Sequence, residues 1–172
     1  DLGCGDRQTD GETDFVLVIP RHGILVLEVK GGELRTKDGS WWTRPRGADD
    51  FKRLSRSPFK QAEDARYRLQ RYLAPQCGAL PFAYAVCFPG GAPHGGLGLE
   101  GPDHLVVNRY DIPDLPARIE RLLRDTGMSG PLPGSMVEKV TEILAPTALI
   151  APVLLQESRT ASAELERVEF AP

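Results

Sequence analysis

The sequence predicts an α/β domain in which helices flank a mixed β-sheet. Two short aliphatic runs, residues 15–19 and 24–27, are apolar on both faces, which is typical of strands buried inside a helix-covered sheet. Segments with apolar residues at helical spacing follow at 59–73, 114–125 and 135–144. The order is strand, strand, hairpin, helix, strand, strand, helix, helix, which favours a layered α/β fold.

Length and composition favour one domain in a reducing compartment. The chain has 172 residues, and we expect residues 1–157 to form the domain and the polar residues 158–172 to be an extension or a linker toward a following domain. The three cysteines form no CxxC pair, which argues against disulfides and zinc. No apolar stretch reaches the length of a membrane span. We therefore expect a cytoplasmic protein without membrane contact, and the abundance of Arg, Ala, Gly and Pro indicates a bacterial source.

The remaining elements follow from turn and capping signals. Asp38-Gly39 predicts a hairpin between residues 34–36 and 41–43. Ser57 is the expected N-cap of a helix that begins at Pro58 and ends before Pro75. Residues 82–88 and 104–107 are the last two expected strands.

Three charged residues lie at the ends of the first two strands. Glu28 and Lys30 are two apart and share a face. A three-residue turn at 21–23 would give Gly23 the left-handed conformation and would make Asp14 and Glu28 diagonal neighbours, roughly 7–8 Å apart at the backbone. That turn sets the register Pro20 with Ile24, Val16 with Glu28 and Asp14 with Lys30.

Two interpretations of these residues stay open. Lys30 can form a structural ion pair with either acid at the sheet edge. Alternatively, Asp14 and Glu28 bind Mg²⁺ (or Mn²⁺), a hard cation that prefers oxygen ligands. The ion would activate a water, and Lys30 would orient that water or offset charge that develops on a phosphodiester.

The segment from Arg44 to Arg71 is basic although the chain has a net charge of −3. It holds nine basic and four acidic residues, so it is a candidate surface for phosphates, with a solvated helix face as the alternative. The helical residues expected to contact DNA are Lys60, Arg66, Arg68 and Arg71.

Other motifs carry less information. Residues 96–101 match GxGxxG but do not join a strand to a helix, so no nucleotide cofactor is expected. His22, His94 and His104 have no metal-ligand spacing, although His22 lies close enough in sequence to contact a phosphate near the site. Of the neighbours Trp41 and Trp42, at least one is expected in the core because they point to opposite faces.

Residues 11–90 resemble the NERD (nuclease-related) family of the PD-(D/E)XK superfamily. The resemblance rests on four ordered motifs: Gly-Glu-Thr-Asp-Phe-Val-Leu-Val from Gly11, Gly-Ile-Leu-Val-Leu-Glu-Val-Lys-Gly-Gly from Gly23, Trp41-Trp42, and Ser-Pro-Phe-Lys-Gln-Ala from Ser57. It implies a restriction-endonuclease-like αβββαβ core and metal-dependent phosphodiester hydrolysis. The implied catalytic residues are Asp14, Glu28 and Lys30, with the Val29 carbonyl as a further metal ligand and Gln61 contacting a metal-bound water or a phosphate. Simple hydrogen bonding at the helix N-terminus is the alternative role of Gln61.

The chain departs from the family pattern at two places. The family begins with a helix that carries an acidic residue, and this chain starts after the expected position of that helix. Ala65 stands where related nucleases often have Tyr. We expect a nuclease domain that acts on DNA within a larger, helicase-linked protein. The alternatives are a catalytically silent nucleic-acid-binding module and a protein-interaction domain.

Overall fold

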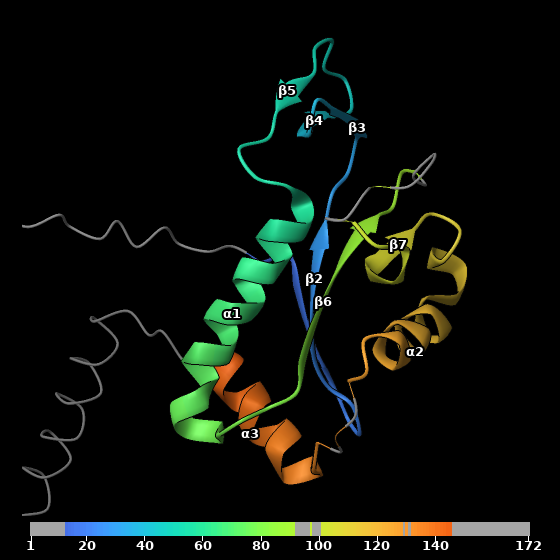
Figure 1. Cartoon of the computed structure of the whole chain (residues 1–172). Helices are drawn as coiled ribbons and strands as arrows, with labels where there is room; N and C mark the ends of the chain where they lie inside the picture. The colour runs from blue at the N-terminus through green and yellow to red at the C-terminus, as the bar shows by residue number, and fades with distance from the viewer. Residues whose placement is uncertain (1–12, 92–96, 98–100, 129, 131, 146–172) are drawn as a thin grey trace, which may run out of the picture. The chain divides into compact units, whose positions relative to one another are not determined.

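The computed structural model describes residues 13–91, 97, 101–128, 130 and 132–145 (Figure 1). Contacts divide the chain into the units Asp1–Thr141 and Glu142–Pro172, and the fold described below is that of the first. The predicted domain boundary at residue 157 lies outside the described residues. The strands are β1 (Phe15–Ile19), β2 (Gly23–Val29), β3 (Glu33–Lys37), β4 (Ser40–Arg44), β5 (Lys52–Arg53), β6 (Phe82–Phe88) and β7 (Val106–Asn108). The α-helices are α1 (Pro58–Cys77), α2 (Leu115–Asp125) and α3 (Gly134–Leu144). Two short 3₁₀ helices are η1 (Asp103–Leu105) and η2 (Ile112–Asp114).

The central sheet is mixed, as the sequence predicts. Its order is β1-β2-β6-β7, with β1 antiparallel to β2 and with β2, β6 and β7 mutually parallel. The chain passes from β2 to β6 through the hairpin and α1, which supplies the long crossover that parallel strands require. Strand β2 is buried over six of its seven residues, as expected for a strand covered on both faces.

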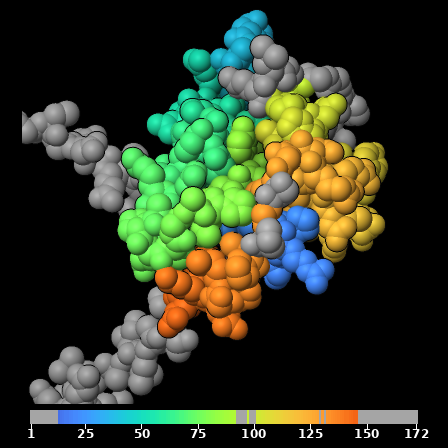
Figure 2. Space-filling model, turned by 60° about the horizontal axis from the view of Figure 1, so that its bottom comes forward, coloured from blue at the N-terminus to red at the C-terminus, as the bar shows by residue number. Residues whose placement is uncertain are grey.

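Helices pack on both faces of this sheet. Phe59 and Ala62 of α1 belong to one apolar cluster with Val86 of β6, whereas Leu122 and Leu123 of α2 belong to a second cluster with Leu25 of β2. Figures 1 and 2 show α1 (green) and α2 (orange) on opposite sides of the domain. Full burial of a leucine side chain contributes about 1.5–3 kcal/mol. The mixed α/β fold class is confirmed.

The pairing of β1 with β2 differs from the predicted register by two residues. The turn consists of Pro20, Arg21 and His22, one residue earlier than predicted, and Ile19 pairs with Gly23. Arg21 takes the positive φ of 70°, and Gly23 has a φ of 135°. Val16 consequently pairs with Val26 and not with Glu28. Glycine is needed at position 23 because a Cβ there would lie 2.5 Å from the Pro81 carbonyl oxygen.

The third strand of the expected αβββαβ core lies in a sheet of its own. Strand β3 pairs with β4, and β4 with β5, in a separate three-stranded sheet beyond the C-terminal end of β2 (Figure 1). The predicted hairpin at Asp38-Gly39 is confirmed, with Lys37 paired to Ser40. The change of sheet follows Gly31 and Gly32, and Gly32 has a φ of 80° that places its backbone against Arg44.

Two other boundaries differ from the predictions. Helix α1 passes through Pro75 and ends at Cys77. Proline lacks a backbone N–H and so removes one hydrogen bond of the helix, but in the solvent-exposed last turn this loss costs little. His104 and Leu105 belong to η1, and the strand expected at 104–107 begins at Val106. The Ser57 N-cap is confirmed: its hydroxyl accepts the Lys60 N–H at 3.1 Å.

Within the described part of the chain, none of the helices is both long and apolar enough to cross a membrane.

Candidate active site

Asp14 lies beside the C-terminal end of β2. The ladder between β1 and β2 ends at the pair of Phe15 and Leu27, and Asp14 lies in the bend that precedes β1. The Asp14 Oδ2 atom accepts a hydrogen bond from the Val29 N–H at 2.7 Å. Because the register shift is even, a continuation of the ladder would keep Asp14 on the predicted face, level with Glu28 rather than diagonal to it.

Glu28 is a buried carboxylate that pairs with Lys30. Only 5% of Glu28 is exposed, and the Lys30 Nζ atom lies 2.5 Å from the Glu28 Oε1 atom. Burying a carboxylate without a partner costs several kcal/mol, so the lysine compensates this charge. The Lys30 side chain is 24% exposed, and it therefore connects the buried carboxylate with solvent.

The face that carries Glu28 is the face covered by α1. Glu28 pairs with Val86 across the parallel ladder, and Val86 packs in one cluster with Phe59 and Ala62 from the first turns of α1. The helix therefore begins level with Glu28, and Gln61 belongs to the same two turns.

The Val29 backbone faces the strand that carries Asp14. Its N–H donates to Asp14, whereas the Lys30 N–H donates to the Cys87 carbonyl of β6 at 2.9 Å. In a strand the N–H and C=O of one residue point to the same side, so the Val29 carbonyl also points toward β1. Oxygen donors of three residues, the Asp14 and Glu28 carboxylates and the Val29 carbonyl, thus belong to this strand end.

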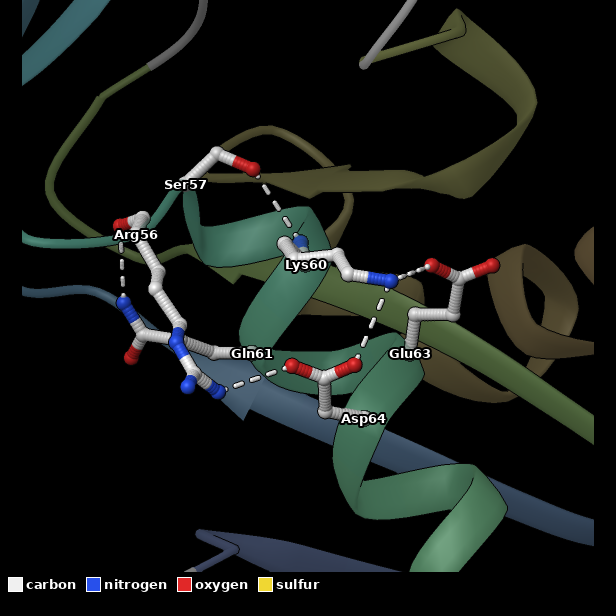
Figure 3. A network of polar contacts seen from close by, with 6 residues as sticks. All are labelled: Arg56, Ser57, Lys60, Gln61, Glu63 and Asp64. Carbon is white, nitrogen blue, oxygen red and sulfur yellow. Dashed lines mark hydrogen bonds and ion pairs between the residues drawn. The ribbon is translucent and has the colours of Figure 1, made fainter.

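Gln61 is held by the segment that precedes α1. Its Nε2 atom donates to the Arg56 carbonyl at 3.0 Å, and Figure 3 shows the amide turned toward that carbonyl. Among the hydrogen bonds and ion pairs of the described residues, none joins Gln61 to Asp14, Glu28 or Lys30. The contact with Arg56 matches the structural alternative, and a role in catalysis stays a prediction.

The basic residues predicted on α1 do not share one face. Lys60 pairs with Glu63 at 2.9 Å and with Asp64 at 3.2 Å (Figure 3). The hydrogen bond to Glu63 raises the pKa of Lys60, and both carboxylates reduce the local positive charge. The Arg66 guanidinium lies 3.9 Å from the Tyr67 ring centroid and 5.8 Å from that of Tyr84.

Arg68 and Arg71 lie elsewhere on the helix. Arg71 is exposed and Arg68 is half-buried. Residues two apart on a helix point to different sides, so Arg66 and Arg68 are not parts of one surface. Contact of these residues with DNA stays a prediction.

The structure describes the positions of some of the remaining motifs. His22 lies in the β1–β2 turn and His104 in η1, whereas His94 and most of residues 96–101 lie outside the described residues. Trp41 is 6% exposed and packs against Phe59 and Phe88, with ring centroids 5.9 and 6.5 Å away. Trp42 is half-buried on the opposite face of β4. The expectation that at least one of the two lies in the core is confirmed.

The oxygen donors fit the predicted magnesium ion. Among the described residues there is no group of three or more His, Cys, Asp and Glu side chains that could hold a metal. Mg²⁺ needs no such group, because it is commonly held by one or two carboxylates and keeps several waters. Asp14 and Glu28 with the Val29 carbonyl supply a donor set of this kind, and Asp14 retains Oδ1 after its bond to Val29.

Arg118 is an anchoring residue that the sequence interpretation missed. It is 8% exposed, and its guanidinium donates to the carbonyls of Asp103, His104 and Val106. It thereby ties α2 to the segment that leads into β7. The available signal was helical spacing, because Arg118 lies on the apolar side of α2 between Leu115 and Leu122.

A mixed sheet with helices on both faces, and with two carboxylates and a lysine at its strand ends, defines an α/β domain with a restriction-endonuclease-like core. The family model "NERD: Nuclease-related domain" matches residues 1–89 of the 172, and the chain belongs to this family. The match spans β1 to β6, and Asp14, Glu28, Lys30 and Gln61 lie inside it. Neither the search of curated proteins nor the search of solved structures gave a match.

Proposed function

We propose that this nuclease-related domain hydrolyses DNA phosphodiester bonds with Mg²⁺ or Mn²⁺, as one part of a larger DNA-processing protein that includes a helicase domain. The observation that carries the proposal is the presence of two acids at the end of β2: Asp14 accepts the Val29 N–H, and the adjacent Glu28 is paired with Lys30. Asp14 keeps its Oδ1 atom after its bond to Val29, so it can share a cation with Glu28.

Each residue has a role that follows from its chemistry. Asp14, Glu28 and the Val29 carbonyl hold the ion, which when bound acts as a Lewis acid and lowers the pKa of water. With Glu28 holding the ion, the Lys30 ammonium would be available to offset negative charge on the phosphodiester oxygens. Gln61 orients a phosphate or a water through its amide after it leaves the Arg56 carbonyl.

A catalytically silent nucleic-acid-binding module is the second candidate. The observation that favours it is the ion pair between Glu28 and Lys30, which satisfies the buried carboxylate without a metal. The two candidates differ in whether the carboxylates bind a divalent ion. A protein-interaction domain would bind neither the ion nor nucleic acid.

The test is calorimetry with Mn²⁺ on the wild type, Asp14→Asn and Glu28→Gln, together with cleavage of linear and circular DNA by the parent protein. We expect both substitutions to abolish Mn²⁺ binding and cleavage, because each removes a charged oxygen donor. Asp103→Asn is the control, since Asp103 is an exposed carboxylate of η1, away from β2. Equal Mn²⁺ affinity in the wild type and both site variants would exclude the proposed metal site.

A further inference from the structure

We infer that an arginine-lined cleft between the β3–β4 hairpin and the loop after β7 binds an unpaired nucleic-acid strand. The inference rests on the proposed function only in taking that strand to be the substrate of the domain. The cleft has a volume of about 1070 Å³. That is at the upper limit of small-molecule pockets, about 300–1,000 Å³, and suits a polymer segment better.

The charge of the cleft is opposite to that of the chain. The described residues that line it include four arginines, Arg35, Arg44, Arg46 and Arg109, and one acid, Glu33. The lining therefore carries a net charge of +3, whereas the whole chain carries −3. A concave surface of one charge in a chain of the opposite charge concentrates an oppositely charged ligand.

Two of the arginines are available to a ligand. Arg44 pairs with Glu33, and the Arg35 guanidinium lies 3.9 Å from the Phe51 ring centroid. Arg46 and Arg109 are both exposed, and within the described ranges no carboxylate lies within ion-pair distance of either. Arginine binds phosphate oxygens through two parallel N–H groups, so these two side chains are the expected phosphate contacts.

Tyr110 adds a surface on which a base can stack. It is 76% exposed, although it lies on an ordered turn and lines the cleft. The Arg109 guanidinium lies 5.6 Å from its ring centroid. An exposed aromatic ring beside arginines is the combination with which proteins bind single strands, because each unpaired base offers a flat face.

Hydrogen bonds hold the turn that carries these residues. The Asn108 N–H donates to Asp111 Oδ2 and the Tyr110 N–H to Asn108 Oδ1, both at 2.9 Å. The Arg109 N–H donates to the Gly91 carbonyl at 3.0 Å. A rigid platform loses little conformational entropy on binding, which favours a recognition role over an incidental exposed ring.

The cleft is continuous with the candidate active site along the chain. Gly32, which lines the cleft, follows Lys30 by two residues. Two residues of extended chain span at most about 7 Å between Cα atoms. A strand in the cleft would therefore approach Lys30, whereas the basic residues of α1 point to several sides of that helix.

The experiment is fluorescence anisotropy of a labelled single-stranded DNA with the full chain in EDTA, so that binding is measured without cleavage. We expect Arg46→Gln with Arg109→Gln to weaken binding at least tenfold and to reduce the salt slope by about 0.7 per arginine. The control is Arg121→Gln with Arg124→Gln, which removes two exposed arginines from α2 and should change the Kd less than twofold. Equal loss of affinity in the cleft double variant and in the α2 control would overturn the cleft assignment. Loss of binding in Arg68→Gln with Arg71→Gln alone would also overturn it.

The Tyr110 variants test whether the strand must be unpaired. We expect Tyr110→Ala to weaken binding by about five- to a hundredfold, the usual effect of losing one stacked base, and Tyr110→Phe to keep wild-type affinity. An abasic strand of the same length should bind more weakly than the normal strand and should be insensitive to Tyr110→Ala. Equal affinity for the abasic strand, or for a duplex, would overturn the assignment of an unpaired strand.

Cleavage with Mg²⁺, measured separately, distinguishes the two proposals. If the wild type does not cleave DNA and the cleft variants lose binding, the cleft assignment is supported and the nuclease proposal is contradicted. Cleavage by the wild type together with unchanged binding in the cleft variants would contradict the cleft alone.

Discussion

Glu28 shows how one buried charge determines the behaviour of its neighbours. The residue is almost fully buried in β2, and the ammonium of Lys30 lies 2.5 Å from it. Breaking a buried pair costs more than the pair contributes, because the remaining charge stays in a poorly solvated place. Under the proposed function, stability and catalysis would depend on the same lysine, and only a change of both partners would separate the two effects.

We expect Lys30→Ala to slow DNA cleavage by on the order of 10²–10⁴-fold. The same change should lower the free energy of unfolding by about 1–3 kcal/mol, because Glu28 is left without its partner. Cleavage assays and urea unfolding measure the two effects. Glu28→Gln with Lys30→Met should recover most of the stability but no cleavage, and wild-type cleavage by Lys30→Ala would remove Lys30 from the mechanism.

The connection from β2 to β3 decides where the hairpin lies relative to the site. Gly32 has a φ of 80°, and a Cβ there would lie 2.5 Å from the Arg44 carbonyl oxygen. Gly47 has a similar φ of 84°, but a Cβ at that position would meet no atom within 4 Å. Both glycines have a positive φ, but only at Gly32 would an added Cβ overlap another part of the backbone. The two positions are therefore a matched pair for substitution by alanine.

We expect Gly47→Ala to destabilise the domain by about 1–2 kcal/mol, the cost of a left-handed non-glycine residue. Gly32→Ala should cost about 1–3 kcal/mol more, because the Cβ overlaps the Arg44 backbone and forces the hairpin to move. Urea unfolding gives both values. If the hairpin holds the cleft in place, Gly32→Ala should also weaken single-strand binding, and equal unfolding free energies for the two variants would contradict the close approach.

At the scale of the whole molecule, the described residues form two apolar clusters. One cluster lies between the sheet and α2, and the other joins α1, the sheet and the hairpin through Trp41, Phe59 and Phe88. Of the predicted metal ligands, Asp14 and Glu28 belong to neither cluster, whereas the Val29 side chain packs against the first. The metal should thus add to a fold that already exists.

We expect EDTA to leave the Tm of the wild type unchanged and Mn²⁺ to raise it. An ion present at a hundred times its Kd stabilises the folded state by about 2.7 kcal/mol. Thermal unfolding followed by circular dichroism measures the shift, and Asp14→Asn should lose it. Unfolding of the wild type in EDTA would contradict a core that is independent of metal.

Much of the fold follows from local sequence signals. The apolar runs of β1, β2 and β6, the Asp38-Gly39 hairpin and the Ser57 cap each depend on a few adjacent residues, and the structure confirms them. The predicted end of α1 is too early, because a proline in the last turn of a helix costs little. The predicted start of β7 is two residues too early, because His104 and Leu105 belong to a 3₁₀ turn whose short apolar pattern resembles that of a strand.

The local sequence predicts which residues form the candidate site and which face they share. Alternation along a strand has a period of two, so the error of two residues in the β1–β2 register leaves the predicted face of Asp14 unchanged. The bond of Asp14 to Val29, the bond of Gln61 to Arg56 and the separate sheet of the hairpin depend on tertiary contacts. The cleft with Arg46, Arg109 and Tyr110 also depends on tertiary structure, because its walls come from segments about sixty residues apart, and no local periodicity encodes such a contact.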